Sequence, residues 1–479
     1  MRTIGNTPVA GEVRAVASGA LANGDTVVVN ADGTVSIIVE TVDPTPELGS
    51  PTVYESANTG ATDTATFDST NNKVIIAYRD AGNSNFGTAV VGTVSGVSIT
   101  FGTPVVFESS FANAISATFD TSASKVVIAY SAAGTSNFGA AKVGTVSGTS
   151  ISFGSSVIFI AATSSSYSAT FDSANNKVVI AYRRISTGYG TAVVGAVSGT
   201  SITFGSTVVF ESASSQDVAS TFDSTNNKVV ISYTDLGNAR RGTAVVGTVS
   251  GTSISFGSPA IFANATVNYT SVTFDSNSNK VVVAYSDAVN SGFGTAAVGT
   301  VSGTSISFGT PVVFESGNTY RPSATFDSST NRVVVSYADA GSSVRGTLTV
   351  GTVSGTSISF ITPIVFETGV TTAKSDSAVF DSSANRVVIP YSGKAIVVKS
   401  AEISTNLTAE NFIGFADGAA ADGTSAVVQT GCSINDAQSG LTAGQAYYVQ
   451  TDGTLRETPD NPSVLAGTAV SATKLIVKG

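Results

Sequence analysis

The sequence of 479 residues contains no His, no Trp, one Cys and one Met. Without His there is no Ser-His or Cys-His catalytic pair, no His-bound metal and no ordinary proton shuttle at neutral pH. A single Cys excludes an intrachain disulfide and a cysteine zinc cluster. Triads that depend on His, and metal sites built from His or from clustered Cys, are therefore excluded by composition.

Charged residues are also scarce, at 12% of the chain, and acidic residues outnumber basic ones by 33 to 23. The net charge of −10 argues against nucleic acid as a partner, because phosphate binding needs a basic surface. No apolar run is long enough for a membrane span, and the N-terminus lacks the apolar core of a signal peptide. With 42% hydrophobic residues the chain must bury apolar surface in short segments, which predicts many β-strands.

One phrase recurs along the chain, for example ATFDSTNNKVIIAY from Ala65 and ATFDSANNKVVIAY from Ala169. Its seven copies are spaced 51 to 54 residues apart. Their aspartates are Asp68, Asp120, Asp172, Asp223, Asp275, Asp327 and Asp381. A fixed period of this length is typical of solenoids, propellers and arrays.

Each repeat contains four strand patterns. The first is SATFD, followed by a tight D-S-x-x-N-K turn and by KVVIAY, which is apolar enough to be buried on both faces. The third is GTAVVGTV and the fourth TSISFGTPVVFES, whose internal Gly predicts a bulge. Four antiparallel strands per repeat predict the blade of a β-propeller.

The repeat phase predicts a closed ring. The last repeat ends without its fourth strand, and a matching segment, LGSPTVYES at 48–56, precedes the first repeat. We therefore predict an all-β fold with a seven-bladed propeller over 46–403, in preference to an open solenoid with exposed edges. Residues 1–45 and 404–479 would form one small β domain, into which the propeller is inserted.

The two faces of the predicted propeller differ among the seven copies. The DSTNNK and VSGTS turns return almost unchanged, whereas the two-three loops and the blade-to-blade loops vary. The predicted blade-to-blade loops include 110–115, 163–167, 214–218, 265–269, 318–322 and 370–376. Varied loops on a rigid scaffold, with aromatic and Arg side chains, are typical of binding sites. The candidate ligand-binding residues are Phe111, Tyr167, Arg183, Arg184, Tyr189, Arg240, Arg241, Tyr269, Tyr320 and Arg321. The alternative is that these loops diverged after duplication and bind nothing.

Other polar residues have simpler interpretations. The seven aspartates could surround a calcium ion on the axis, but we expect each to cap its own turn with the Asn or Ser four residues on. The loops at Asp80, Asp235, Asp287 and Asp339 lack calcium-loop spacing, and we interpret Cys432 as a bland buried thiol. We predict neither cofactor nor metal.

An enzyme is not predicted. Glycosidases need only two carboxylates, so the absence of His does not exclude them. The candidate acids Asp63, Asp217 and Asp376 have no common spacing, and the Trp-containing boxes of propeller sialidases are absent.

The whole repeat, together with NFIGFADG at 411–418 and QSGLTAGQAYYVQTDGTL at 438–455, resembles virion structural proteins of marine tailed bacteriophages. This resemblance implies a capsid decoration protein, head fibre or tail fibre on the virion surface. The terminal β domain would contact other virion proteins, copies would assemble on the particle, and the variable face would meet a host glycan or receptor. The alternatives are a lectin-like cell-surface binding module and a sialidase-like depolymerase.

Overall fold

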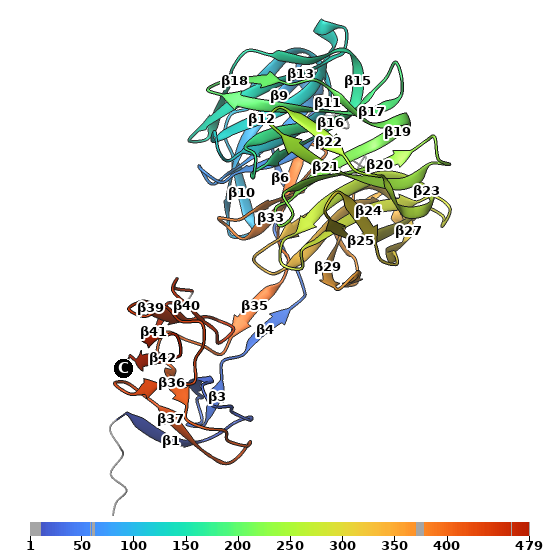
Figure 1. Cartoon of the computed structure of the whole chain (residues 1–479). Coiled ribbons are helices and arrows are strands. Elements are labelled where there is room, and N and C mark those ends of the chain that lie inside the picture. Colours follow the sequence, from blue (N-terminus) through green and yellow to red (C-terminus); the bar gives the residue numbers. More distant parts are fainter. Residues whose placement is uncertain (1–10, 58, 60–62, 370–377, 461, 479) are drawn as a thin grey trace, which may run out of the picture. The chain divides into compact units, whose positions relative to one another are not determined.

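The computed structural model describes residues 11–57, 59, 63–369, 378–460 and 462–478. These residues form strands and three short 3₁₀ turns, Ala81–Asn83, Ala133–Thr135 and Ala340–Ser342, and contain no α-helix. Across these ranges no helix has the length and hydropathy of a membrane crossing. The chain divides into two compact units, Pro44–Ala401 and a unit of both ends, Met1–Asp43 with Glu402–Gly479 (Figure 1).

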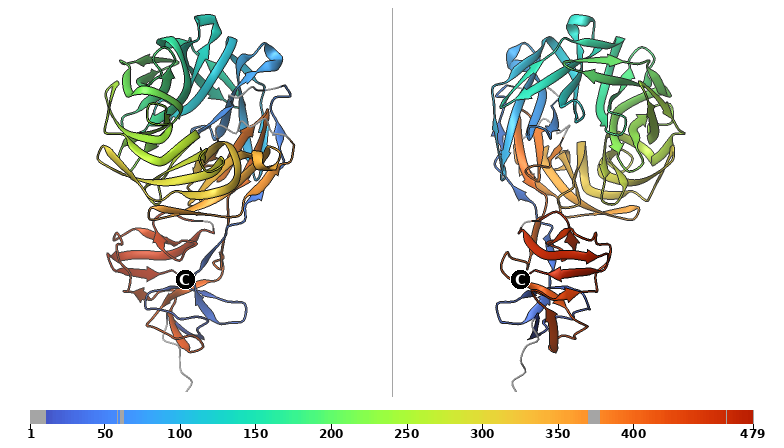
Figure 2. Two further views of the ribbon diagram at one scale, coloured as in Figure 1. Left: turned by 90° about the vertical axis from the view of Figure 1, so that its right-hand side faces the viewer. Right: turned by 60° about the vertical axis from the view of Figure 1, so that its left-hand side comes forward.

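The larger unit is built by antiparallel pairing of successive strands around a ring (Figure 2). Five strands of 16 residues each carry the chain from one repeat to the next: β11 (Val105–Asp120), β15 (Val157–Asp172), β19 (Val208–Asp223), β23 (Ala260–Asp275) and β27 (Val312–Asp327). The first half of each long strand pairs with a strand that precedes it in the chain, and the second half pairs with the strand that follows it. Residues 105–111 of β11 pair with β9, and residues 112–120 pair with β12.

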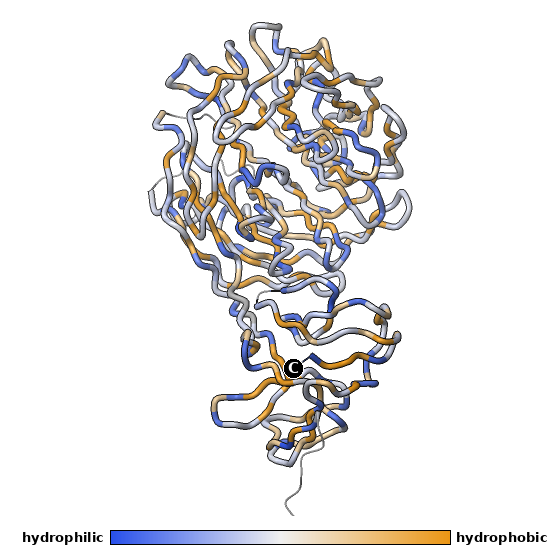
Figure 3. The backbone as a smooth tube through the Cα atoms, turned by 90° about the vertical axis from the view of Figure 1, so that its left-hand side faces the viewer, coloured by the Kyte–Doolittle hydropathy of each residue, from blue (hydrophilic) through white to orange (hydrophobic). Residues whose placement is uncertain are grey.

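The next strand of each repeat is almost completely buried, as its apolar pattern predicts. Val178, Val179 and Ile180 of β16, for example, have no exposed surface. These strands are β8 (Lys73–Asp80), β12 (Lys125–Ala132), β16 (Lys177–Arg184), β20 (Lys228–Asp235), β24 (Lys280–Asp287), β28 (Arg332–Asp339) and β33 (Arg386–Tyr391). Figure 3 shows hydrophobic stretches recurring along the backbone of the ring.

Outside them lie a third strand and a short outer strand. The third strands are β9 (Phe86–Ser95), β13 (Phe138–Ser147), β17 (Tyr189–Ser198), β21 (Arg241–Ser250), β25 (Phe293–Ser302), β29 (Arg345–Ser354) and β34 (Lys394–Lys399). The short outer strands are β10 (Ser98–Phe101), β14 (Ser150–Phe153), β18 (Ser201–Phe204), β22 (Ser253–Phe256), β26 (Ser305–Phe308) and β30 (Ser357–Phe360).

A glycine follows five of the six short outer strands, with Ile361 after β30 as the exception, for a reason that the sequence did not show. A Cβ on Gly102 would lie 1.9 Å from the carbonyl oxygen of Thr149 in the next repeat. Gly154 and Gly205 make the same approach to Thr200 and Thr252. The glycine therefore permits backbone contact between successive repeats.

The N-terminal segment closes the ring as the repeat phase predicts. Strand β34 pairs with β5 (Glu47–Leu48) and with β6 (Thr52–Val53). The remaining ring strands are β7 (Thr64–Asp68), β31 (Ile364–Glu367) and β32 (Val379–Asp381). Both exposed edges of the repeat array are thus removed.

The smaller unit mixes strands from both chain ends. One sheet has the order β1-β37-β36-β2-β3, with β1 (Glu12–Val16), β2 (Thr26–Val29), β3 (Val35–Ile37), β36 (Phe412–Ala416) and β37 (Ser425–Gln429). The other has the order β38-β42-β41-β39-β40, with β38 (Ile434–Asn435), β39 (Ala446–Val449), β40 (Leu455–Arg456), β41 (Val464–Ser471) and β42 (Lys474–Val477). Strands β4 (Glu40–Asp43) and β35 (Glu402–Thr405) pair with each other. Cys432 of this unit is exposed, which corrects the expectation of a buried thiol.

Candidate functional site

Each turn aspartate accepts hydrogen bonds from the backbone of its own turn. Asp223 is 1% exposed. Its Oδ1 accepts hydrogen bonds from the Thr225 and Asn226 backbone N–H groups at 3.0 and 2.9 Å, and its Oδ2 accepts one from Asn226 Nδ2 at 2.8 Å. The partners lie two and three residues on, which corrects the expected four. The fourth residue, Asn227, instead adopts a left-handed backbone with φ 54°.

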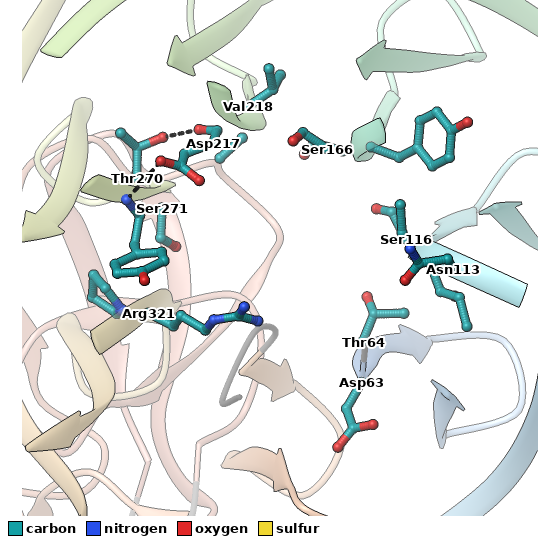
Figure 4. A pocket seen from close by; sticks show the side chains of 17 residues that line it. Asp63, Thr64, Asn113, Ser116, Ser166, Asp217, Val218, Thr270, Ser271 and Arg321 are labelled. Atoms are coloured by element: carbon teal, nitrogen blue, oxygen red, sulfur yellow. Dashed lines mark hydrogen bonds between the residues drawn. The ribbon is translucent and has the colours of Figure 1, made fainter. Parts of the chain in front are cut away.

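A cavity of about 390 Å³ lies where the long strands cross between repeats (Figure 4). Its wall uses the same short segment from six successive repeats, which lies four to seven residues before each turn Asp. These segments are 63–64, 113–116, 166–168, 217–219, 269–271 and 321–322. The predicted loops 110–115, 163–167, 214–218, 265–269 and 318–322 are therefore parts of continuous strands, which is a correction. The predicted loop at 370–376 lies outside the described residues.

Five of the six wall segments contain a bulge with one residue in the left-handed region. The pairing register shifts between Asn113 and Ser116, for example, and Ala114 there has φ 48°. The residues at this position are Ala114, Ser166, Asp217, Tyr269 and Arg321, with φ between 48° and 54°. Such a backbone costs a side-chain-bearing residue on the order of 1 kcal/mol, yet none of the five is glycine. The ring geometry keeps the bulge while the side chain varies.

Three of these varied residues give one side of the cavity its polar and aromatic character. The Asp217 Oδ2 accepts a hydrogen bond from the Tyr269 backbone N–H at 3.1 Å, and Thr270 Oγ1 donates to the Asp217 carbonyl oxygen. The Arg321 guanidinium lies 5.7 Å from the centre of the Tyr269 ring, a cation–π distance. Figure 4 shows the Arg321 side chain extending into the cavity.

Serines on the wall are used to connect repeats. Ser116 Oγ accepts from the Ala169 backbone N–H at 2.9 Å, and Ser271 Oγ accepts from Ala324 N–H at 2.9 Å. Ser168 Oγ does the same for the Ser220 backbone N–H at 2.9 Å. These side chains hold the wall in place, which preorganises the cavity for a ligand.

Of the ten residues predicted from the sequence, the cavity brings together Tyr167, Tyr269 and Arg321. Tyr320 is not part of the cavity wall, but the centre of its ring lies 6.1 Å from that of Tyr269. Tyr167 corrects the expectation of an exposed loop aromatic, since it is 7% exposed and its hydroxyl lies 2.6 Å from Ser164 Oγ. Burial raises the pKa of the Tyr167 hydroxyl well above its usual value.

The other predicted residues lie away from the cavity wall. Arg183 Nη2 donates to Ser214 Oγ at 3.4 Å, Arg240 Nη2 to Asn268 Oδ1 at 2.8 Å and Arg241 Nη1 to Asn238 Oδ1 at 3.1 Å. The Arg79 guanidinium lies over the Phe111 ring, 4.9 Å from its centre. Arg184 and Tyr189 are exposed.

The sequence did not reveal that Ala114, Ser166 and Asp217 occupy the same position in their repeats, the left-handed residue of the bulge. Asp217 was considered only as an acid. The available signal was the column six residues before each turn Asp, which reads Ala, Ser, Asp, Tyr and Arg in the described repeats.

The candidate acids do not share one arrangement. Asp63 is fully buried and accepts a hydrogen bond from Thr59 Oγ1 at 2.9 Å. Asp217 accepts the hydrogen bond from Tyr269 described above, and Asp376 lies outside the described residues. Within the ranges that the structure covers, no three or more His, Cys, Asp or Glu side chains are grouped to hold a metal ion.

No protein-family model and no curated protein matches the sequence. The chain is similar in structure to the BP39L lectin from Burkholderia pseudomallei, with a TM-score of 0.53 at 11% identity over 73% of this chain and 98% of that one. It shows a weaker likeness to a mutant of Aleuria aurantia lectin in complex with alpha-methyl-L-fucoside, with a TM-score of 0.41 at 14% identity over 65% and 97%. A leech intramolecular trans-sialidase gives a TM-score of 0.43 at 8% identity over 74% and 69%.

The fold is a β-propeller. The likeness to BP39L and the antiparallel ring of repeats agree on this point. At 11% identity the likeness shows the fold alone, so the function must be argued from the cavity.

Proposed function

We propose that this chain is a non-enzymatic, lectin-like carbohydrate-binding protein whose ligand site is the cavity of the propeller. The observation that carries the proposal is the cluster of Asp217, Tyr269 and Arg321 at one bulge position of three successive repeats. A cavity of about 390 Å³ is in the range of small-molecule sites.

The chemistry of the cluster fits a sugar. A carboxylate accepts hydrogen bonds from sugar hydroxyls, a guanidinium donates to ring and hydroxyl oxygens, and an aromatic ring packs against the apolar C–H face of a pyranose. Asp217, Arg321 and Tyr269 provide these three functions. The name of the neighbour BP39L, a lectin, supports the same class of ligand.

The cavity is also asymmetric, because the opposite side carries Ala114 and Ser166 at the same structural position. Small side chains there leave room, whereas the side with Asp217 and Tyr269 offers contacts. One saccharide unit would therefore be held on the Tyr269 side, while the remainder of a longer glycan passes over Ala114 and Ser166.

Glycan-array screening of the full chain, followed by calorimetry with the bound glycan, tests the proposal. We expect Tyr269→Ala and Asp217→Asn to weaken binding at least tenfold, which is about 1.4 kcal/mol. Tyr189→Ala is the matched control, because Tyr189 is an exposed tyrosine outside the cavity wall. The absence of glycan binding, or equal losses in Tyr269→Ala and Tyr189→Ala, would contradict it.

We also infer that the ring has seven blades of four strands. The seven turn aspartates and the strand exchange between β34 and the N-terminal segment support this count. The phage resemblance stays a prediction, in which the β unit of both chain ends contacts virion proteins while the propeller displays its cavity. Mass spectrometry of purified virions tests that placement.

A depolymerase is the alternative that the experiment must separate from a lectin. Incubation of a bound polysaccharide with the full chain should release no reducing sugar. Release that Asp217→Asn abolishes would replace the lectin with an enzyme.

A further inference from the structure

The contacts between successive repeats hold a row of half-buried glutamates outside the cavity wall. We call each contact between a long strand and the buried strand that follows it a seam. Glu108, Glu211 and Glu315 each accept a hydrogen bond at Oε2 from a tyrosine hydroxyl across a seam. The distance from Tyr337 Oη to Glu315 Oε2 is 2.8 Å.

Some seams bring a second carboxylate to the glutamate, at the end of the buried strand. In the seam of Glu211 this is Asp235, and burial together with the Glu211 charge raises the pKa of the Asp235 carboxyl. The Asp235 Oδ1 is satisfied by the Gly237 backbone N–H at 3.0 Å. In the seam of Glu55, the Asp80 Oδ1 accepts from Asn83 N–H at 3.0 Å.

The seam of Glu315 differs, because its second carboxylate has an unpaired oxygen. Asp339 is 8% exposed, and its Oδ1 is buried with no hydrogen-bond partner among the described residues. A Cβ on Gly317 would lie 3.0 Å from this Oδ1 and 3.3 Å from Glu315 Oε1, so both oxygens face the same point. Glu315 Oε1 accepts from the Gly317 backbone N–H at 2.8 Å, so Asp339 Oδ1 is the oxygen of this pair that lacks a donor in the described part of the chain. A buried, unpaired carboxylate oxygen beside a second carboxylate is costly, and a bound cation would stabilise it.

Another seam shows that a cation fits beside this glutamate. The equivalent residue of the last complete repeat, Glu367, receives the Lys394 ammonium at 2.9 Å from its Oε2. That seam has Gly393 where the Glu315 seam has Asp339. Lysine there supplies the charge that the Glu315 seam must obtain elsewhere.

We propose that Glu315 and Asp339 form a binding site for a divalent cation of the calcium type. The donors are all oxygen, which favours a hard cation over zinc or copper. Two protein carboxylates, with solvent completing the shell, predict a dissociation constant on the order of 10⁻⁴–10⁻³ M. The site escapes calcium-loop motifs because its two carboxylates come from different strands, β27 and β28.

One nearby charge competes with the cation. Arg345 lies opposite Asp339 in the β28–β29 hairpin and is exposed. If its guanidinium neutralised the carboxylates in solution, Arg345→Ala would be needed before a cation could bind.

Terbium luminescence on the full chain tests the proposal, because terbium replaces calcium at oxygen sites and tyrosine sensitises its emission. The chain has no Trp, so Tyr337 is the sensitiser at this seam. We expect emission that calcium competes away and that falls at least fivefold in Asp339→Asn, Glu315→Gln and Tyr337→Phe. Asp287→Asn is the matched control, because Asp287 occupies the same strand position but its seam has Ala263 in place of glutamate.

Circular dichroism of each variant establishes that it is folded, and agreement between the Asp339 and Glu315 variants guards against a local folding defect. Emission that persists in both variants, or that Asp287→Asn also removes, would overturn the site. Absence of emission from the wild type would overturn the cation site. Emission that appears only in Arg345→Ala would show that the Arg345 guanidinium, and not a bound cation, neutralises the two carboxylates.

Discussion

Two aspartates six residues apart on β19 mark the two faces of the ring, the turn end with the D-S-x-x-N-K turns and the cavity end with the bulges. They show how differently these two faces are built. Asp223 is buried at the turn end and accepts hydrogen bonds from residues two and three positions on. Asp217 is part-buried at the cavity end, and its Oδ2 accepts from Tyr269 in the next repeat, 52 residues away. The first set of contacts is local and the second is made across repeats.

This difference explains which end varies. Every turn Asp serves its own turn, so any copy that lost it would lose its own hairpin. At the cavity end the ring imposes the bulge, and the side chain of the left-handed residue is free to change. A constant end with occupied acceptors is scaffold, whereas a varied end with strained, side-chain-bearing residues is where we place binding.

The comparison would break if the two aspartates proved interchangeable. Asp223→Ala leaves three donors of the turn without their acceptor, so we expect a loss of about 3 kcal/mol in unfolding free energy. Asp217→Ala should cost about 1 kcal/mol, because the two hydrogen bonds that it removes, from the Tyr269 N–H at 3.1 Å and from Thr234 Oγ1 at 3.4 Å, lie at a part-buried site. Urea denaturation followed by circular dichroism measures both.

Asp223→Asn is the control for that experiment, since its amide oxygen still accepts from the Thr225 and Asn226 backbone. It should recover at least half of the loss. Equal destabilisation by Asp223→Ala and Asp217→Ala would show that both ends are scaffold.

The sequence predicted what is local and repeated. The strand pattern, the capping role of the turn Asp and the strand exchange that closes the ring all follow from the phase of one phrase. The bulges did not follow, because Tyr269 and Arg321 are not residue types that signal a left-handed backbone. The cavity and the Glu315–Asp339 pair depend on contacts between repeats, which no local pattern encodes.

A glycine at the bulge sharpens the comparison. Ala114 has φ 48°, so Ala114→Gly should relieve strain and raise the unfolding free energy by about 0.5 kcal/mol. Ala123→Gly at the turn end should lower it by about 0.5–1 kcal/mol, because Ala123 is not left-handed and glycine there adds only chain entropy. The expected result is that the unfolding free energy rises in one variant and falls in the other in the same denaturation assay. A fall in both variants would show that the backbone at Ala114 is not strained.

The smallest expected effect is a pH dependence at the Glu211–Asp235 seam. Because the pKa of Asp235 is raised in the folded state by burial and by Glu211, folding gains stability as this carboxyl is protonated and loses it as the pH rises above 3.8. Asp235→Asn removes the ionised form while its amide oxygen still accepts from Gly237. The variant should therefore be more stable than the wild type near pH 7, by less than about 1 kcal/mol, and equal to it in acid.

Asp287→Asn is the matched control for this pH dependence, because the seam of Asp287 has Ala263 and no second carboxylate. Thermal unfolding of the three proteins between acid and neutral pH gives the measurement. A gain near pH 7 in Asp235→Asn but not in Asp287→Asn assigns the cost to the pair Glu211–Asp235. The same gain in both variants would mean that the neighbouring glutamate makes no contribution, since Asp287 is half-buried and has no such neighbour.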